Sequence, residues 1–279
     1  MIRPCAYFKP RRLDEAFTAL QREGARLLAG GTDLLVAMRK GLEAVELLVD
    51  AKGLDELAVL SVHPTNGATV GARITLNALI EDARIRTSFP IISEAAGTVA
   101  TYQLRNRATL AGNICNASPA ADMAPPLYVL AAEVLIAGPA GERTLPIGSF
   151  LTGVKKTALA KGELVLGVRF PHPGPARTAF MKKQRIKGHD LASVNVAGLA
   201  DKAAGTLRIC VGACAPTPVL LEGTDELYRK ARGIEALADQ VAALALGSTA
   251  PIDDVRSSAE YRRDIVQVLV KRIVRVICS

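Results

Sequence analysis

The chain of 279 residues contains no tryptophan, and aromatic residues make up only 4% of it. Proteins that bind single-stranded nucleic acid stack the bases on exposed aromatic rings, so a platform of that kind is not expected. Apolar residues account for 49% of the sequence, which is enough for aliphatic sheets and helices around a sizeable core. The net charge of +8 is spread along the chain and permits an anionic ligand without demonstrating one.

The sequence also lacks the usual patterns of metal ligands, disulfides and catalytic groups. Its five cysteines include no CxxC pair, its three histidines are isolated and no HExxH motif occurs, so no metal site is predicted. Cys210 and Cys214 are expected on one face of a strand, packed in the core. No Ser-His-Asp set is visible, so no catalytic residue is predicted. Without a signal peptide or a membrane-spanning apolar run, a cytoplasmic protein with reduced thiols is expected.

The first 54 residues read as a small βαβ unit. Apolar residues at helical spacing predict a helix over 13–20, followed by a strand over 25–28, a helix over 33–39 and a strand over 46–50. The turn Ala29-Gly30-Gly31-Thr32 lies between the end of a strand and the start of a helix, where free N–H groups favour an anion. Thr32 is expected to cap the helix. Neither GxGxxG nor a P-loop motif occurs, so both of those nucleotide sites are excluded.

The pattern changes to antiparallel pairing near residue 55. Two strands over 57–62 and 68–72 predict a hairpin, and further strands are expected over 134–137 and 164–170. Helices are expected over 76–83, from Pro90 onwards and from Pro125 onwards. A larger antiparallel α+β lobe is therefore predicted over 55–175, after the first lobe over 1–54.

The segment 109–122, TLAGNICNASPAAD, fits neither a helical nor a strand period. It combines hydroxyl and amide side chains with Gly112, which lets backbone N–H groups approach a ligand. We interpret it as a polar loop of fixed shape whose donors suit a phosphate or diphosphate. An ordinary turn that caps its own helices is the alternative. Two such glycine-containing segments, one in each lobe, favour one elongated ligand in the cleft between them.

A proline-rich linker at 171–175 separates these lobes from a C-terminal α+β domain, predicted over 176–279. Strands over 179–185, 192–200 and 207–213 predict an antiparallel sheet, and helices are expected over 225–232, 234–246 and 259–277. The last helix repeats apolar residues every four positions from Tyr261 to Ile277, so one side is expected to be packed. Its basic residues, including Arg262, allow a nucleic-acid stripe, but a solvated face is the favoured interpretation.

Four segments together resemble a known family: LLAGGTDLL at 27–35, QLRNRATLAGNICNASPAAD at 103–122, GELVLGVRF at 162–170 and MKKQRIKGHDLASV at 181–194. In this order and spacing they are similar to the FAD-binding medium subunit of the molybdenum hydroxylases, which include xanthine dehydrogenase and carbon monoxide dehydrogenase types. The resemblance covers nearly the whole chain. It implies a two-lobed FAD-binding fold followed by a C-terminal antiparallel sheet with a helix bundle.

The resemblance also implies which positions contact a non-covalently bound FAD. The diphosphate would lie on the first segment, comprising Leu28, Ala29, Gly30, Gly31, Thr32, Asp33 and Leu34. The second segment would contribute Thr109, Gly112, Asn113, Asn116 and Asp122, with Asp122 on the adenosine or ribityl side. The remaining contacts would come from Ala100 and Thr101 beside the isoalloxazine, from Leu164 and Val165, and from Lys182.

This sequence departs from the family pattern at two positions near these contacts. Ala111 stands where many members have glycine, and Val99 stands where the eukaryotic xanthine enzymes place an aromatic ring over the flavin. The inserted loop with four cysteines found in the 4-hydroxybenzoyl-CoA reductase type is absent, so no iron–sulfur cluster is predicted in this chain.

The implied function is an electron-transfer subunit of a heteromeric oxidoreductase. By resemblance, electrons would leave a molybdenum centre in a large subunit, pass through [2Fe-2S] clusters in a small subunit and enter this FAD. They would then go to NAD+, a quinone or another acceptor. Two alternatives stay open: a stand-alone flavin oxidase of related fold, and a basic nucleotide- or nucleic-acid-binding module without chemistry.

Overall fold

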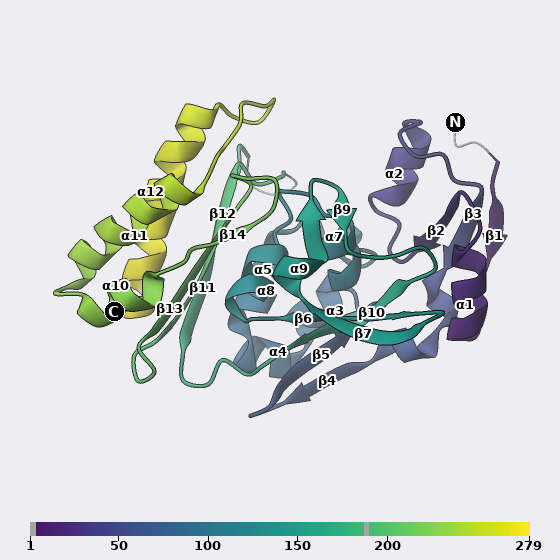
Figure 1. The fold of residues 1–279 in the computed structure, drawn as a ribbon, viewed down its shortest axis with the longest axis horizontal. Helices are drawn as coiled ribbons and strands as arrows, with labels where there is room; N and C mark the ends of the chain where they lie inside the picture. Colours follow the sequence, from purple (N-terminus) through teal and green to yellow (C-terminus); the bar gives the residue numbers. More distant parts are fainter. Residues whose placement is uncertain (1–3, 187–189) are drawn as a thin grey trace.

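A computed structural model describes residues 4–186 and 190–279, in which three larger sheets follow one another along the molecule and a fourth has only two strands (Figure 1). Lys187, Gly188 and His189, which belong to the fourth segment of the resemblance, lie outside the described residues. The mixed α+β fold and its antiparallel sheets agree with the fold class predicted from the sequence. Each sheet falls within one of the ranges 1–54, 55–175 and 176–279, and these boundaries themselves stay a prediction.

The N-terminal region is the predicted βαβ unit with one additional strand. Its elements are β1 (Ala6–Phe8), α1 (Leu13–Leu20), β2 (Ala25–Leu28), α2 (Leu34–Arg39) and β3 (Leu47–Asp50). Strand β3 lies between β1 and β2, and both pairings are parallel. The sequence did not predict β1, because three exposed residues are too few to show an alternating pattern.

The middle region is built on a five-stranded antiparallel sheet of order β4-β5-β10-β6-β7. Its strands are β4 (Leu60–His63), β5 (Gly67–Gly71), β6 (Glu133–Gly138), β7 (Gly141–Pro146) and β10 (Leu164–Phe170), with a small hairpin of β8 (Leu151–Gly153) and β9 (Lys156–Thr157). Its helices are η1 (Ala51–Gly53), η2 (Asp55–Ala58), α3 (Leu76–Glu81), α4 (Ala83–Ser88), α5 (Pro90–Thr98), α6 (Tyr102–Arg105), α7 (Leu110–Cys115), α8 (Ala124–Val129) and α9 (Ile147–Phe150).

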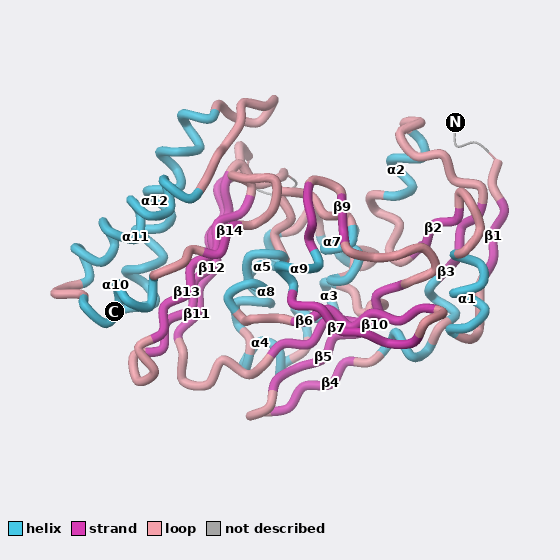
Figure 2. Tube along the Cα trace, in the orientation of Figure 1, coloured by secondary structure: helices cyan, strands magenta, loops and turns pink. Residues whose placement is uncertain are grey.

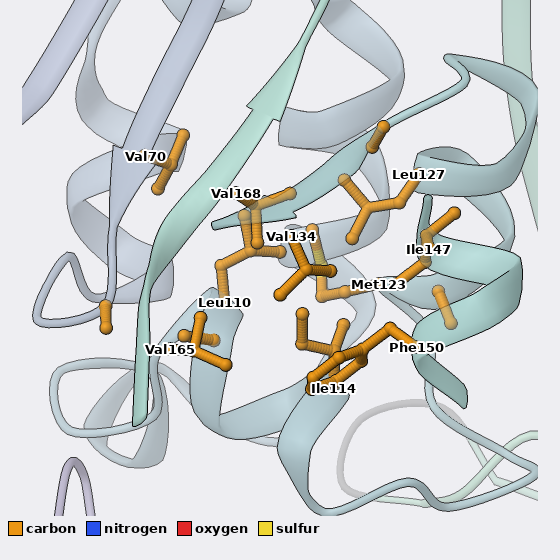
Figure 3. Packing of buried hydrophobic residues seen from close by; sticks show 14 of the residues in the cluster. Val70, Leu110, Ile114, Met123, Leu127, Val134, Ile147, Phe150, Val165 and Val168 are labelled. Carbon is orange, nitrogen blue, oxygen red and sulfur yellow. The ribbon is translucent and has the colours of Figure 1, made fainter. Parts of the chain in front are cut away.

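The helix predicted over 76–83 is present as α3 and ends two residues early, at Glu81. The next helix, α4, was not predicted; it begins where the Asp82 carboxylate accepts hydrogen bonds from the N–H groups of Arg84 and Ile85. One expectation for this region was wrong. The segment 109–122 was expected to contain no regular structure, but it forms α7. Leu110 and Ile114 lie one turn apart and both point into the core (Figure 3). A helix of six residues is too short for a periodic pattern to stand out.

The C-terminal region is a four-stranded antiparallel sheet covered by helices. Its elements are β11 (Arg177–Lys183), β12 (Val194–Asp201), β13 (Thr206–Gly212), β14 (Val219–Leu220), α10 (Thr224–Lys230), α11 (Ile234–Ser248) and α12 (Ala259–Cys278). Helix α12 packs on one face of the sheet, and α5 and α8 of the middle region pack on the other (Figure 2). The side of the middle region that carries α5 and α8 therefore shares an interface with the C-terminal sheet.

The structure also corrects details of the C-terminal prediction. Arg262 is 1% exposed, so the basic residues of α12 do not form the uniformly solvated face that was expected. It donates to the carbonyls of Ser193 and Ala213 and pairs with Asp254 at 2.6 Å. Tyr261, by contrast, is 40% exposed although the four-residue repeat placed it on the packed side. A basic stripe interrupted in this way offers less to a nucleic-acid backbone.

Cys210 and Cys214 are both buried, which confirms that they serve core packing. They do not share one face of a strand, because β13 ends before Cys214 and the two thiols enter different hydrophobic clusters.

Candidate functional site

The first segment of the site approaches the second through a glycine. A Cβ atom at Gly30 would lie 2.0 Å from the carbonyl oxygen of Arg107, which is two residues before the cap of α7. No side chain fits in that space, so the main chain of the N-terminal region packs directly on the main chain of the middle region. Gly31 has a φ of +75°, a left-handed conformation that glycine adopts without a steric penalty. The structure thus places the first glycine segment against residues 107 and 108, directly before the second glycine segment.

The rest of the first segment leads into α2. The N-cap of this helix is Asp33 and not Thr32 as predicted. The Asp33 side chain makes no capping hydrogen bond, because the backbone at Asp33 has helical φ and ψ instead of the extended conformation of a capping residue. Leu28, Ala29 and Leu34 are partly buried around the turn. The turn presents backbone N–H groups at a helix start, and it places no lysine or arginine within the segment.

The second segment begins with a capped helix. Thr109, which is 4% exposed, accepts a hydrogen bond from the N–H of Gly112 through its hydroxyl oxygen at 2.9 Å. The side-chain oxygen of Asn113 is buried and has no hydrogen-bond partner within the described part of the chain. Buried polar atoms are normally paired, so this oxygen has the capacity to accept a bond from a ligand.

Asn116 ends α7 and is held from the other side by the β8–β9 hairpin. Lys155, at the tip of that hairpin, donates from its ammonium group to the Asn116 side-chain oxygen at 2.6 Å and from its backbone N–H to the Ala117 carbonyl at 2.8 Å. Lys155 has a left-handed φ of +57°. Sequence reasoning missed Lys155, since a lysine in a hairpin turn gives no signal that it contacts a segment 39 residues away.

Asp122 and Lys182 form a buried ion pair. Their charged atoms are 2.7 Å apart, and their side chains are 5% and 3% exposed. The Lys182 ammonium also donates to the carbonyl oxygens of Thr98 and Asp190, each at 3.0 Å. Its three hydrogens therefore all have protein acceptors. In this arrangement Lys182 offers a ligand its positive charge but no free hydrogen.

The Asp122 carboxylate of that pair also accepts a hydrogen bond from Asn195. This residue of β12 is fully buried and donates its side-chain N–H to Asp122 at 2.8 Å. Burial raises the pKa of the Asp122 carboxyl above its ordinary value, while the ammonium of Lys182 and the amide of Asn195 act in the opposite direction. Sequence reasoning missed Asn195, because the asparagine lies within an apolar strand and resembles a satisfied core residue.

A cavity of about 430 Å³ lies beside this ion pair. Its lining residues are Gly97, Thr98, Ala100, Thr101, Tyr102, Arg105, Lys182 and Gln184. Three predicted contacts, namely Ala100, Thr101 and Lys182, thus surround one space. Thr101 caps α6 by accepting a hydrogen bond from the N–H of Leu104 at 3.3 Å.

Leu164 and Val165 are placed differently from the other predicted contacts. They are 1% and 2% exposed, and the side chain of Val165 packs in the core near Leu110 (Figure 3). These exposures cover the main chain as well as the side chains, so neither residue presents an accessible surface to a ligand in this structure. The strand has an irregularity there, between Val165 and Gly167.

The Cys115 thiol is buried, and the described residues contain no cluster of metal ligands. Burial raises the pKa of the Cys115 thiol to about 12, although this residue lies within the second segment. Among residues 4–186 and 190–279, no three histidine, cysteine, aspartate or glutamate side chains are grouped so that they could hold a metal ion. None of the helices in these ranges has both the length and the apolar character needed to cross a membrane.

Taken together, the predicted residues form two connected parts. Residues 28–34 meet the residues just before α7 at Gly30, and Ala100, Thr101, Asp122 and Lys182 surround or adjoin the cavity. The single chain segment 109–122 runs from one part to the other. An elongated ligand with an anionic part suits this arrangement, and the unpartnered Asn113 oxygen can accept a hydrogen bond from such a ligand.

The chain was compared with known families and proteins. The model of the FAD binding domain in molybdopterin dehydrogenase matches residues 3–173, and that of the CO dehydrogenase flavoprotein C-terminal domain matches residues 179–277. A putative xanthine dehydrogenase FAD-binding subunit of Escherichia coli strain K12 is 30% identical over 280 residues, covering 96% of this chain and 94% of that protein. The carbon monoxide dehydrogenase medium chain of Afipia carboxidovorans is 30% identical over 273 residues, with coverage of 96% and 94%.

Solved structures show the same relationship. A chain of the carbon monoxide dehydrogenase of Hydrogenophaga pseudoflava matches with a TM-score of 0.94 at 28% identity, covering 100% of this chain and 99% of that one. A chain of quinoline 2-oxidoreductase from Pseudomonas putida 86 matches with a TM-score of 0.93 at 27% identity, with coverage of 99% and 98%. The fold is thus a two-lobed FAD-binding fold with a C-terminal domain. The chain belongs to the family of FAD-binding domains of molybdopterin dehydrogenases.

Proposed function

We propose that this chain is the FAD-binding electron-transfer subunit of a heteromeric molybdenum-containing oxidoreductase, and that FAD is bound non-covalently. The observation that carries the proposal is the direct packing of Gly30 on the Arg107 carbonyl, which joins the two anion-suited segments of the two lobes into one surface. The unpartnered, buried oxygen of Asn113 supports a ligand at the same place.

The individual residues would act mainly by binding and orienting the cofactor. Backbone N–H groups of 28–34 and of the start of α7 would hold the diphosphate through dipoles. Thr109 would fix the start of α7 through its capping hydrogen bond, and Asn113 would accept a hydrogen bond from the ligand. Asp122 would retain acceptor capacity for a sugar hydroxyl, since a carboxylate can accept more than the two bonds it has from Lys182 and Asn195.

The flavin, when bound, supplies the redox chemistry, while the protein positions it and adjusts its electronic environment. Ala100 and Thr101 would contact the ring system at the cavity, and Leu164 and Val165 would support this surface from β10. Lys182 would place a positive charge there that Asp122 largely compensates. No acid–base catalyst is proposed, because the role of the chain is electron transfer.

The partners would be a large molybdopterin-binding subunit and a small [2Fe-2S] subunit, as the resemblance implies. The small subunit would deliver electrons to this FAD, and NAD+, a quinone or another acceptor would remove them. The free state of the cysteines within the described residues is compatible with the reducing cytoplasm that we propose as the location.

The proposal is tested by adding FAD to the purified chain, either alone or with its partner subunits. We expect binding of one FAD per chain and absorption bands near ~370 and ~450 nm, as for flavins in general. N113A should weaken binding, whereas N66A, in the exposed turn between β4 and β5, should not. A chain that is correctly folded, colourless and unable to take up added FAD would sink the proposal.

A further inference from the structure

The bend between α5 and α6 is held by cations from two regions of the molecule. Three successive carbonyl oxygens, those of Thr98, Val99 and Ala100, accept hydrogen bonds from cationic side chains. Lys182 reaches Thr98 at 3.0 Å, and Arg105 reaches Val99 at 2.9 Å and Ala100 at 3.3 Å through one guanidinium nitrogen. Charge-assisted hydrogen bonds of this kind are stronger than those between neutral groups.

Within this bend Ala100 has a φ of +47°. Residues other than glycine rarely adopt this left-handed conformation, and it persists only where the surroundings hold it in place. Such positions cluster at functional sites. Ala100 also lines the cavity of about 430 Å³, so the held conformation and the candidate site coincide.

Arg105 is itself fixed by Asn77 of α3. Asn77 is 3% exposed, and its side-chain oxygen accepts a hydrogen bond from the guanidinium Nε of Arg105 at 3.1 Å. Its side-chain nitrogen donates to the Tyr102 carbonyl at 2.9 Å and to the Asn106 side-chain oxygen at 2.8 Å. This single buried amide therefore orients the guanidinium and ties the bend to α3.

The charges on the two sides of the cavity differ. The ammonium of Lys182 is compensated by Asp122, whereas Arg105 forms no ion pair with any carboxylate in the described ranges. Arg105 lines the cavity with a positive charge that no carboxylate pairs directly, and the Glu81 carboxylate nearby is bound to the Tyr102 hydroxyl. A positive charge near a group stabilises the more negative of its two states.

We propose that Arg105, oriented by Asn77, is a positioning residue for the flavin ring. It holds the bend 98–100 in the shape that receives the ring, and its charge makes the bound flavin easier to reduce. This inference rests on the proposed function, because it presupposes that the ring occupies this cavity. Asn77 acts only through Arg105 and the bend.

The test uses the complete chain, with FAD affinity, thermal unfolding and the midpoint potential of bound FAD measured at saturating FAD. R105M should weaken FAD binding about tenfold or more, through the loss of charge-assisted hydrogen bonds, and should shift the potential to more negative values. R105K should weaken binding severalfold and leave the potential near that of the wild type, because the charge stays but the planar fork is lost. R84M, which removes an exposed arginine of α4, should change neither the FAD affinity nor the midpoint potential.

A second substitution separates positioning from general packing. A100G should have little effect in the wild-type chain but should restore part of the FAD affinity to R105M, because glycine adopts the left-handed conformation without being held. It should not restore the potential, since the charge remains absent.

If R105M does not fold, N77D serves instead. Its carboxylate can still accept from Arg105 but cannot donate to Tyr102 or Asn106, so folded N77D should bind FAD more weakly. Wild-type affinity and potential in R105M, or wild-type affinity in folded N77D, would overturn this inference. Failure of the wild-type chain to bind FAD would instead overturn the proposed function, so the two failures are distinguishable.

Discussion

The end of the site near residues 28–34 is made of main chain, whereas the end near Lys182 is made of buried side-chain charges. At the first end, Gly30 excludes every side chain and the N–H groups of the turn serve as donors. At the second end, the Asp122 carboxylate accepts hydrogen bonds from Lys182 and Asn195, so each of these buried groups needs its neighbour as a hydrogen-bond partner. The first end should therefore be sensitive to added volume, and the second to the loss of one partner.

The largest effect is expected at the charged end. K182M leaves the Asp122 carboxylate buried without its counter-charge, which should cost about 3–5 kcal/mol of unfolding free energy. The double variant K182M/D122N should recover much of that loss, because it removes both charges together. Denaturant unfolding of the three proteins measures the difference. If the double variant were less stable than K182M, the pair could not be described as mutually compensating.

A smaller effect is expected where the two lobes meet. G30A places a methyl group 2.0 Å from the Arg107 carbonyl oxygen, and the backbones must separate to admit it. We expect a loss of about 1–3 kcal/mol in stability, the usual cost of overpacking, together with a large loss of FAD affinity.

The control for that change is G247A, in α11, where a Cβ meets nothing within 4 Å. It should leave FAD affinity unchanged and stabilise the chain by about 0.4–1 kcal/mol, since alanine reduces the entropy of the unfolded state. Equal FAD affinity in G30A and G247A would show that the contact at Gly30 does not shape the site.

The cap of α7 offers a subtler way to disturb the main-chain end. T109A removes the hydroxyl that accepts from Gly112, at a cost of about 1 kcal/mol in stability. S258A removes the corresponding cap of α12 at a similar cost, but it lies in the C-terminal region. FAD titration should show weaker binding for T109A alone. Equal FAD affinity in both variants would show that the capping hydrogen bond of α7 is not needed to bind the ligand.

The smallest effect depends on pH and concerns the ion pair of Arg185 and Asp190, which solvent weakens because the arginine is exposed. Hydrogen bonds from Arg185 lower the pKa of Asp190 to about 2, against a partial opposing effect of burial. The carboxylate therefore adds stability above its unfolded pKa of about 3.9, and this contribution disappears as the pH falls through about 2. D190N should be less stable than the wild type at pH 6 and equal to it below the folded pKa, when unfolding is followed across this range. R185M, which removes the partner, should show the same trend, and a pH-independent difference in both would contradict the account.

Several elements of the site could be predicted from residue patterns alone. The βαβ unit was predicted because its helix and strands carry apolar residues at clear periods, and the turn at 29–32 follows from its place between them. Helix α7 was missed because its six residues span less than two turns, and its polar side chains obscure the pair Leu110 and Ile114. The roles of Asp122 and Lys182 as cofactor contacts came only from the family resemblance, since 60 residues separate the two and no local pattern links them.

By itself the sequence determined most of the local elements, the order of the three regions and the family to which the chain belongs, because periodicity and motif spacing are properties of neighbouring residues. Only the tertiary structure decided that Gly30 meets the Arg107 carbonyl, that Lys182 has no hydrogen to spare and that Asn77 orients Arg105. These contacts join distant positions, and their chemistry depends on burial and direction. Neither property exists until the chain has packed.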